Sequence, residues 1–451
     1  MNYKVIEELE NPANNRILLG LDRIKEILLL LGNPQNSYKV VHITGTNGKG
    51  STAAFIECGL IHAGYKVGKY TSPHINKINE NISLNGNVIA DDDLERLFFQ
   101  VKAVQNQHNI ELSPFELLTV IMFCYFKEQL IDYLVLEVGM GGANDATNVI
   151  DEPLCVVITN ISLEHTNWFG SSLMDIANEK SGIIKSDIPV IIADSSHELQ
   201  LAICNKSPNI TNVLEKYDAI IELDFDNFRT NLTFNERIEV QKLVYEKNDI
   251  SDSAIVSQAS KRKFSYQLSL FGKFQAYNFL CAYEVFNFLG ISESAIKYAA
   301  QNTLNGGRLQ LISKNPNVLI DATHNEAGAK VLYESLTEHY HCQDIVIVTS
   351  ILADKNIKSM LTYFGKIANC IICTSINNTS RGMSAQDLYE KALEYSLNKV
   401  TKIYTIDNPI EALEFAKKLS KKHILITGSL YLLKYYTENG AVENWRNHKR
   451  Y

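Results

Sequence analysis

The sequence of 451 residues lacks any apolar run long enough to cross a lipid bilayer. Its longest uncharged apolar stretch, from Leu117 to Phe126, is far shorter than the roughly 20 residues of a membrane-spanning helix. The first residues also lack a basic segment followed by an apolar one, which is the mark of a secretory leader. We therefore expect a cytoplasmic protein with no membrane partner.

An excess of positive charge is also missing. The chain has 43 Lys and Arg residues against 51 Asp and Glu residues, which gives a formal net charge of −8. Proteins that bind nucleic acid usually carry a basic surplus, so we expect no nucleic-acid partner. A hydrophobic fraction of 45% and a charged fraction of 21% are typical of a soluble globular protein, and the length predicts two or three domains.

The cysteines do not form a disulfide or metal pattern. They are scattered, mostly inside apolar segments, at Cys58, Cys124, Cys155, Cys204, Cys281, Cys342, Cys370 and Cys373. The last two have the spacing of a redox or zinc site, but they lie in an apolar run with no second Cys or His pair nearby. We expect reduced thiols that pack as small hydrophobic groups.

Short apolar runs rich in β-branched residues alternate with longer helix-like segments, and this order predicts parallel α/β architecture. The expected strands are Lys39–Ile43, Tyr133–Val138, Leu154–Thr159, Val190–Ala193, Val318–Asp321, Asp344–Thr349, Ile371–Ser375, Lys402–Ile406 and His423–Thr427. Between Ser195 and Lys263 the pattern weakens, which suggests peripheral strands and loops. The turn-forming Asn305–Arg308 suits a hinge, and we predict a domain boundary between residues 296 and 297.

The segment His42–Ser51, with the sequence HITGTNGKGS, is the strongest functional signal. An apolar strand ends there in a glycine-rich loop that carries one lysine, Lys49, and one hydroxyl, Ser51. Such a loop can cradle nucleotide phosphates with its backbone N–H groups, and the hydroxyl can bind Mg²⁺. The spacing departs from the general phosphate-loop pattern, because Gly50 separates Lys49 from Ser51. The alternative is a glycine-rich turn without a ligand.

Further polar residues follow other predicted strands, where ligands of open α/β sheets bind. Glu137 is a magnesium ligand or an acid that caps a glycine turn, and His165 is a metal ligand or a structural histidine. Lys180 and Lys185 contact phosphate or are solvated. Asp321 and the neighbouring His324 and Asn325 contact a nucleotide across a cleft, or they cap the next helix.

These residues, in this order, resemble the Mur ligase superfamily, and most closely its folylpolyglutamate synthase and bifunctional dihydrofolate synthase branch. The resemblance covers almost the whole chain. Its carriers are Leu19–Arg23, Thr44–Ser51, Tyr70–His74, Glu137–Gly142, Asp145–Asn148, Glu164–Thr166, Glu179–Lys185, Gln275 with Asn278, Gly307–Arg308, Asp321 with His324–Asn325, Ala353–Lys355 and Thr427–Tyr431.

The resemblance implies an α/β fold, with an ATP-binding domain of Mur ligase type and mostly parallel sheet over residues 1–296, which includes folate-side elements. It implies a smaller Rossmann-like glutamate ligase domain over residues 297–451. Catalytic residues would be Lys49, Lys180, His165 and His324. ATP would contact Thr46, Asn47, Gly48, Lys49, Gly50, Ser51, Asn278, Arg308 and Asp321. Two Mg²⁺ ions would be held by Ser51, Ser72, Glu137 and His165.

The family also carries a carboxylated lysine at the position of Lys180, which would help to organise the second metal ion. The folate substrate would be lined by Leu19, Gly20, Leu21, Asp22, Ser113, Pro114, Phe115, Glu116, Asn144, Asp145 and Ala146.

The implied reaction is ligation of L-glutamate to a reduced folate, to dihydropteroate, or to both, through an acyl phosphate, by a monomeric enzyme. The chain departs from the family pattern at Asn81, Ala143, Glu164, Phe274 and Glu326. These departures spare the phosphate and metal residues and bear on substrate recognition. Two other interpretations stay open, namely a related ligase that acts on a non-folate acid and a non-catalytic nucleotide-binding scaffold.

Overall fold

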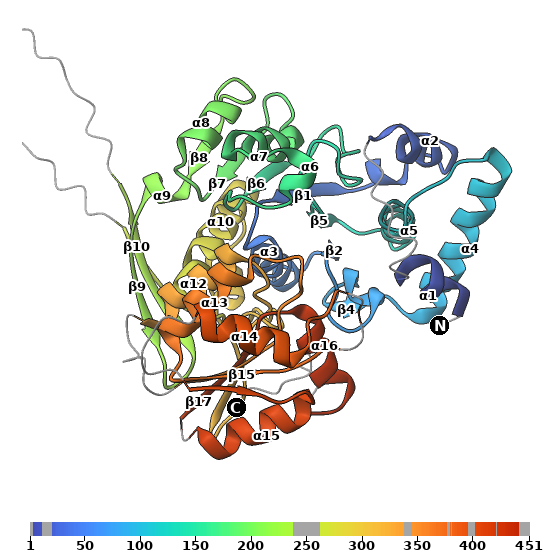
Figure 1. Ribbon diagram of the computed structural model, residues 1–451. Helices are drawn as coiled ribbons and strands as arrows, with labels where there is room; N and C mark the ends of the chain where they lie inside the picture. The colour runs from blue at the N-terminus through green and yellow to red at the C-terminus, as the bar shows by residue number, and fades with distance from the viewer. Residues whose placement is uncertain are drawn as a thin grey trace, which may run out of the picture.

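A computed structural model describes residues 3–10, 20–237, 262–337, 345–376, 379, 381–395, 402–420 and 422–441. Over these residues the chain forms two α/β domains that are stacked on each other, with a small antiparallel sheet at one side of the first (Figure 1). Within this part of the chain, no helix combines the length and the apolar character needed to cross a bilayer.

The N-terminal domain is built on an eight-stranded sheet in the order β4-β3-β2-β5-β1-β6-β7-β8. The pairings β2–β3 and β3–β4 are antiparallel and the others are parallel. The strands are β1 (Lys39–Thr44), β2 (Val67–Tyr70), β3 (Ile82–Leu84), β4 (Asn87–Val88), β5 (Tyr133–Glu137), β6 (Cys155–Ile158), β7 (Val190–Ile192) and β8 (Ile210–Asn212). The central strands are buried on both faces, as expected of a parallel sheet.

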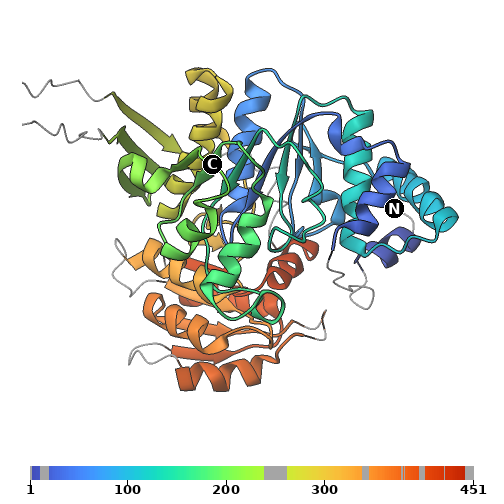
Figure 2. The same cartoon turned by 90° about the horizontal axis from the view of Figure 1, so that it is seen from above.

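Helices cover both faces of this sheet, and Figure 2 shows it between them. One face packs against α3 (Lys49–His62), α10 (Lys273–Leu289) and α11 (Glu293–Asn302). The other packs against α1 (Tyr3–Glu10), α2 (Asp22–Leu30), α4 (Asp91–His108), α5 (Pro114–Glu128), α7 (Leu173–Lys180) and α8 (His197–Ile203). Shorter helical turns are η2 (Pro34–Asn36), η3 (Ile78–Asn81), α6 (Thr166–Phe169), η4 (Ser181–Ile183) and α9 (Val213–Lys216).

The small sheet lies in the region where the sequence pattern is weak. It consists of the antiparallel strands β9 (Tyr217–Asp224), β10 (Arg229–Glu236) and β11 (Lys263–Leu268). Leu232 and Phe234 of β10 and Tyr266 of β11 are buried in the same hydrophobic cluster as α3 and α10. The small sheet therefore extends the core of the N-terminal domain.

The C-terminal domain contains a six-stranded sheet in the order β12-β13-β17-β14-β15-β16, parallel except for the pairing of β12 with β13. The strands are β12 (Gln310–Ser313), β13 (Asn317–Ile320), β14 (Ile345–Thr349), β15 (Cys370–Cys373), β16 (Lys402–Thr405) and β17 (His423–Thr427). One face packs against α12 (Glu326–Thr337), α13 (Ile357–Ile367) and α14 (Ala385–Tyr395), and the other against α15 (Pro409–Leu419) and α16 (Leu430–Glu438).

The expected α/β fold class is confirmed, and all nine expected strands are present with ends shifted by at most two residues. Cys370 and Cys373 are buried in β15, as predicted, whereas Cys204 is exposed and Cys342 lies outside the described residues. The predicted boundary between residues 296 and 297 falls inside α11, which packs on α3. We propose that the domains divide after α11, at the turn 303–309.

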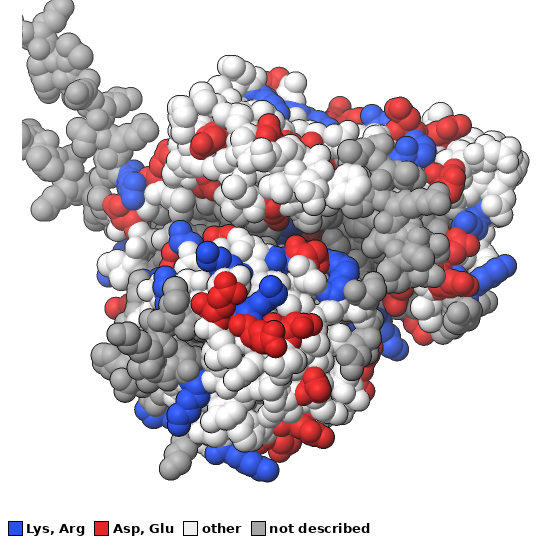
Figure 3. Space-filling model, viewed as in Figure 1, with Lys and Arg blue, Asp and Glu red and all other residues white. Residues whose placement is uncertain are grey.

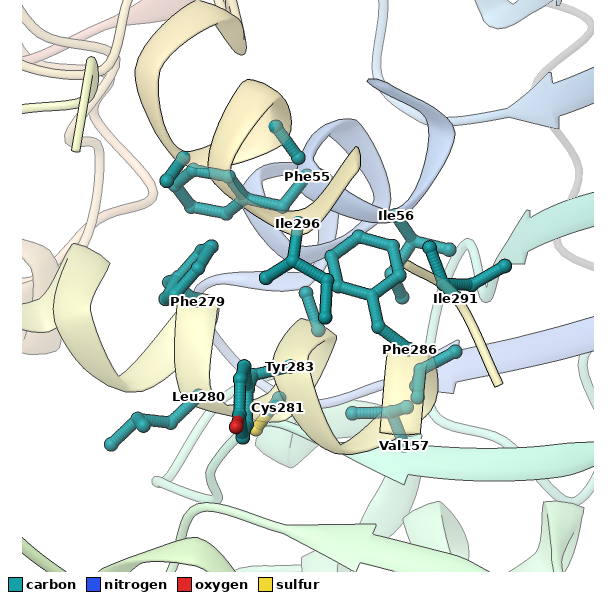
Figure 4. Packing of buried hydrophobic residues seen from close by; sticks show 14 of the residues in the cluster. Phe55, Ile56, Val157, Phe279, Leu280, Cys281, Tyr283, Phe286, Ile291 and Ile296 are labelled. Atoms are coloured by element: carbon teal, nitrogen blue, oxygen red, sulfur yellow. The ribbon is translucent and has the colours of Figure 1, made fainter. Parts of the chain in front are cut away.

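Helix α3 approaches its neighbours closely at Gly59 (Figure 4 shows the surrounding cluster). A Cβ atom built at this glycine would lie 2.5 Å from Cζ of Phe286 and 3.4 Å from the Cβ of Ala299. The first distance is shorter than van der Waals contact allows, so the Phe286 ring leaves room only for a hydrogen atom. The spacing of α3, α10 and α11 therefore depends on a glycine at this position.

We predict that Gly59→Ala destabilises the N-terminal domain by about 1–3 kcal/mol, because the added methyl group overpacks the core. Urea unfolding followed by circular dichroism measures the change. Phe286→Leu provides the matched partner, since it removes ring atoms from the same place. The double variant Gly59→Ala/Phe286→Leu should lose less stability than the sum of the two single losses, and a strictly additive loss would contradict the close approach.

Candidate functional site

The loop between β1 and α3 is held by two close approaches of its glycine backbone. A Cβ atom at Gly45 would lie 1.9 Å from Oγ1 of Thr159, and one at Gly48 would lie 2.3 Å from Oδ1 of Asn278. Both glycines have positive φ angles, +142° and +92°, which side chains disfavour. The glycines at these positions therefore allow the loop to fit between the end of β6 and the start of α10.

The next residues of the loop are tied to the end of β6. The backbone N–H of Thr46 donates to the carbonyl of Asn160 over 2.9 Å, and that of Asn47 donates to Oδ1 of Asn160 over 3.0 Å. Lys49 begins α3, and its Nζ donates to the carbonyls of Gly45 and Thr46 at 2.8 and 3.2 Å. The Lys49 side chain thus bends back over the loop. Two of the three N–H donors of its ammonium group are used there, and the third can donate to a ligand.

Ser51, Ser72 and Glu137 surround the start of α3. Glu137 ends β5 and is 4% exposed, and Oε2 accepts a 3.2 Å hydrogen bond from the backbone N–H of Ser72. Burial raises the pKa of the Glu137 carboxyl, while the charges of Lys49 and Arg308 act in the opposite direction. The buried hydroxyl of Ser51 accepts from Nδ2 of Asn305 over 3.0 Å.

A second charged group lies near Lys49, around α7. Lys180 is 2% exposed, and its Nζ donates to Oε1 of Glu164 over 2.5 Å. Burial lowers the pKa of Lys180 to about 8, although Glu164 raises it. His165 has a left-handed backbone with φ +49°, and its Nε2 lies 3.9 Å from Oε2 of Glu164. Partial burial lowers the pKa of His165, while the carboxylate of Glu164 acts in the opposite direction.

The C-terminal domain supplies the opposite side of the site. Asp321 is buried and orders the turn around it, since its two carboxylate oxygens accept from the backbone N–H groups of Leu309 and Thr323 over 2.7 and 2.9 Å. His324 lies 2.9 Å, through Nδ1, from the carbonyl of Ala322, so Nδ1 carries the proton and Nε2 is left as an acceptor. Burial lowers the pKa of His324 to about 4.

Charges of the two domains act on each other across the boundary between them. Arg308 lowers the pKa of Glu137, and Lys355 lowers that of His165, although both cations belong to the C-terminal part. Glu164 of the N-terminal domain in turn raises the pKa of His324. Figure 3 shows basic side chains, with acidic ones among them, along this boundary.

The predicted ATP, catalytic and metal residues are therefore placed around one region by the described structure. Ser51, Ser72 and Glu137 supply hydroxyl and carboxylate oxygens, which suit Mg²⁺. His165 lies beside Glu164, and the charges of Lys180 and Lys49 act on it. Within the described residues there is no cluster of three or more His, Cys, Asp or Glu residues that resembles a preformed metal site.

The predicted substrate residues are largely held by contacts with other residues of the protein. Ser113 and Glu116 form a capping box at the start of α5, and Glu116 also accepts from Arg23 of α2 over 3.1 Å. The Phe115 ring lies against Gly139, where an added Cβ atom would be 2.3 Å from Cζ. Gly20, Leu21 and Asp22 lead into α2, Pro114 begins α5, and Leu19 lies outside the described residues.

The loop Asn144–Ala146 is also held by contacts with other parts of the protein. The backbone N–H of Asn144 donates to Oε1 of Glu179 over 3.2 Å, and buried Asp145 accepts from the N–H of Met140 over 2.8 Å. Ala146 is part of the core formed by α2, α4 and α5. These contacts explain the residue types without a ligand, so the substrate-lining role of these residues stays a prediction.

Two contributors were missed by sequence reasoning. The sequence around Asn305 predicts only a turn, whereas the hydrogen bond from Asn305 to Ser51 joins positions that are 254 residues apart. Lys355 stands in a family motif without a predicted role, and its effect on the pKa of His165 depends on how the domains are stacked. No local pattern identifies a long-range contact of this kind.

Comparison with known proteins identifies relatives over nearly the whole chain. The Mur ligase middle domain matches residues 43–286, and the Mur ligase glutamate ligase domain matches residues 307–430. The dihydrofolate synthase/folylpolyglutamate synthase of Bacillus subtilis is 33% identical over 92% of this chain and 93% of its own. The dihydrofolate synthetase of Saccharomyces cerevisiae is 29% identical over 92% and 96%. The structure of Escherichia coli FolC in complex with DHPP and ADP has a TM-score of 0.81 at 25% identity, covering 97% of this chain and 96% of the other.

The Glu164–Lys180 pair generates a prediction with a defined pH dependence. In protein whose Lys180 is unmodified, Glu164→Gln leaves the buried ammonium without its partner, and we expect a loss of about 3 kcal/mol in stability near pH 6.5. The pKa of Lys180 in the folded protein, about 8, lies below its ordinary value of 10.5, so the folded state binds this proton more weakly than the unfolded chain. The cost of the buried charge is therefore complete below pH 8 and is relieved as the pH rises towards 10.5.

The loss caused by Glu164→Gln should consequently be smaller at pH 9.5 than at pH 6.5, as measured by urea unfolding at both values. Glu198→Gln on α8, at a half-buried position outside this site, serves as the control and should show little change at either pH. An equal loss at the two pH values would show that the Lys180 charge is not responsible.

Proposed function

The chain belongs to the Mur ligase family, and we propose that it is an ATP-dependent ligase that joins L-glutamate to the carboxylate of a folate-type acceptor. The acceptor is a reduced folate, dihydropteroate, or both. The relatives with full-length similarity support this proposal, because they are named as dihydrofolate and folylpolyglutamate synthases. The observation that carries it is the convergence around one region of the Lys49 loop, buried Glu137, Arg308 of the turn between the domains, and His324 of the second domain.

The chemistry follows from these residue types. An oxygen of the acceptor carboxylate attacks the γ-phosphorus of ATP, ADP leaves, and an acyl phosphate forms. The amine of glutamate then attacks the acyl carbon, and phosphate leaves as the nitrogen loses a proton. Negative charge spreads over the phosphoryl oxygens during the first step, so Lys49, the loop N–H groups and Arg308 stabilise it by position and charge.

The donor set at the start of α3 fits a divalent cation. Glu137 is a buried carboxylate whose pKa is raised by burial, and a bound cation would compensate for the cost of its charge. We infer that Ser51, Ser72 and Glu137 hold Mg²⁺ and that His165 serves a second ion. Mg²⁺ would neutralise charge on the phosphates when it is bound.

Lys180 is suited to carboxylation by its burial and by its low pKa of about 8, because the reactive form of a lysine is the neutral amine. We propose that the modified Lys180 helps to organise the second metal site. Asn278 lies against Gly48 and suits a contact with the bound nucleotide. A monomeric, cytoplasmic state remains our expectation for this enzyme.

Purified protein should incorporate labelled glutamate in an ATP-dependent reaction with dihydropteroate or with a reduced folate as the acceptor. Each acceptor is tested separately, so that dihydrofolate synthase activity on dihydropteroate is distinguished from folylpolyglutamate synthase activity on a reduced folate. Separation of the labelled product by chromatography and measurement of ADP release give independent readouts. If ATP binds but neither acceptor yields a product, the folate assignment is wrong, and a related ligase for another acid becomes the better explanation.

Lys49→Ala should reduce turnover by at least about a thousandfold, because a positioned cation that stabilises phosphoryl charge is removed. The fold should remain, as judged by circular dichroism and urea unfolding. Lys39→Ala is the control, since Lys39 is exposed at the opposite end of β1 and should leave turnover intact. Substantial ligation by the Lys49 variant would mean that ATP binds elsewhere.

A further inference from the structure

A cavity of about 290 Å³ lies beside α3, on a different face from the one that Gly59 presents to α10. One wall consists of α3 residues at helical spacing, and the other comes from β2, β3 and the loop after β2. The turn before β12 closes the space. The lining residues used in the argument below are Gly50, Glu57, Cys58, Lys69, Ser72 and Glu137. We call this space the hinge-side cavity.

A buried ion pair lies in the wall of the hinge-side cavity. Nζ of Lys69 donates to Oε2 of Glu57, and the hydroxyl of Ser83 donates to Oε1 of Glu57 over 2.9 Å. The Glu57 and Lys69 side chains are 8% and 17% exposed. Both oxygens of Glu57 thus have a donor, so this carboxylate needs no further partner.

Lys69, in contrast, has donors to spare. An ammonium group has three N–H donors, and within the described residues Glu57 is the hydrogen-bond acceptor that Lys69 contacts. Two further acids line the cavity: Glu80 accepts from the backbone N–H groups of Ile75 and Asn76 over 2.9 and 3.3 Å, and Glu137 accepts from that of Ser72 over 3.2 Å. Lys69 is therefore a fixed cation whose remaining donors suit an anionic group of a ligand in the cavity.

The cavity is continuous with the reaction centre, because Gly50, Ser72 and Glu137 belong to its lining. An acceptor that already carries glutamate presents two carboxylates on its terminal residue, the γ-carboxylate that reacts and the α-carboxylate that does not. Dihydropteroate presents only the benzoate that reacts. Of the two acceptors, only the glutamylated one therefore offers a cation beside the reaction centre a carboxylate that does not react.

We propose that the hinge-side cavity receives the terminal glutamyl residue of an acceptor that already carries glutamate, and that Lys69 binds its α-carboxylate. This inference rests on the proposed ligase function and assigns a substrate class to it. Glu57 acts as a positioning residue, because it holds the lysine side chain at the wall. Lys69 thereby favours chain extension over the first glutamate addition.

The test is the ratio of kcat/KM for a glutamylated reduced folate to kcat/KM for dihydropteroate. Lys69→Met keeps the length of the side chain and removes the charge, and we expect the ratio to fall by about tenfold to a hundredfold, as for the loss of a charge-assisted hydrogen bond. Lys69→Arg should retain most of the ratio. Lys39→Met, at the exposed end of β1, is the matched control and should not change it.

Lys69→Met leaves Glu57 without its cation and can weaken the fold, so the double variant Glu57→Gln/Lys69→Met is measured beside it. The double variant removes both charges, and we expect the same fall in the ratio. An unchanged ratio in a folded variant overturns the proposal. An equal fall with both acceptors also overturns it, as does a rise in KM for free L-glutamate with both, which would assign the cavity to the incoming amino acid.

Alkylation of Cys58 provides a readout that does not depend on turnover. Cys58 lines the cavity and is partly buried, whereas Cys204 is exposed elsewhere and reports general reactivity. A glutamylated folate should protect Cys58 from iodoacetamide in the wild type but not in Lys69→Met, as measured by mass spectrometry of the peptides. Equal protection by dihydropteroate overturns the proposal.

The two readouts also separate the possible failures. Ligation of dihydropteroate without activity on glutamylated folate, and without protection of Cys58, overturns the cavity assignment and leaves the ligase function standing. The absence of ligation with every acceptor overturns the proposed function itself.

Discussion

The fit of the Gly45–Ser51 backbone between two neighbouring elements is the constraint on which the rest of the site depends. Gly45 and Gly48 lie so close to Thr159 and Asn278 that neither position accommodates a side chain. This fit fixes where α3 begins, and Gly59 then sets the distance from α3 to α10 and α11. The packing of the phosphate loop and that of the core beneath it are thus coupled, because a shift of the loop would also displace α3 and α10.

Burial of charge is the second shared feature of the site. Glu137 ends β5 of one sheet and Asp321 directly follows β13 of the other, and burial raises the pKa of both carboxyl groups. Arg308 lowers the pKa of each, so one guanidinium on the connecting turn compensates acids from both domains. Lys180 is the converse case, a buried cation balanced by Glu164. The ionisation of these groups therefore depends on the relative position of the two domains, because part of the compensating charge belongs to the other domain.

Sequence reasoning located the strands that are uninterrupted apolar runs, since burial on both faces requires them to be so. It missed β2, where Gly68 and Lys69 interrupt the apolar pattern. It predicted peripheral strands in the region of β9 and β10 but not their bounds, because the inward residues of these strands alternate with polar ones. It also identified the loop and the strand-end acids, because few other roles explain glycines and carboxylates at those places. It could not distinguish a ligand contact from a local cap at Ser113 and Glu116, since the capping box uses the same residue types.

The connection between the domains is part of the site as well as a link. Asn305 donates to the hydroxyl of Ser51, and Arg308, three residues later, acts on Glu137 and Asp321. Leu309 in turn donates its backbone N–H to Asp321, which directly follows β13. The same short turn thus contacts the phosphate loop at one end and the first parallel strand of the C-terminal sheet at the other. A rotation of the domains about this turn moves Asn305 and Arg308 together. The hydrogen bond to the hydroxyl of Ser51 and the distance of the Arg308 guanidinium from Glu137 then change at the same time.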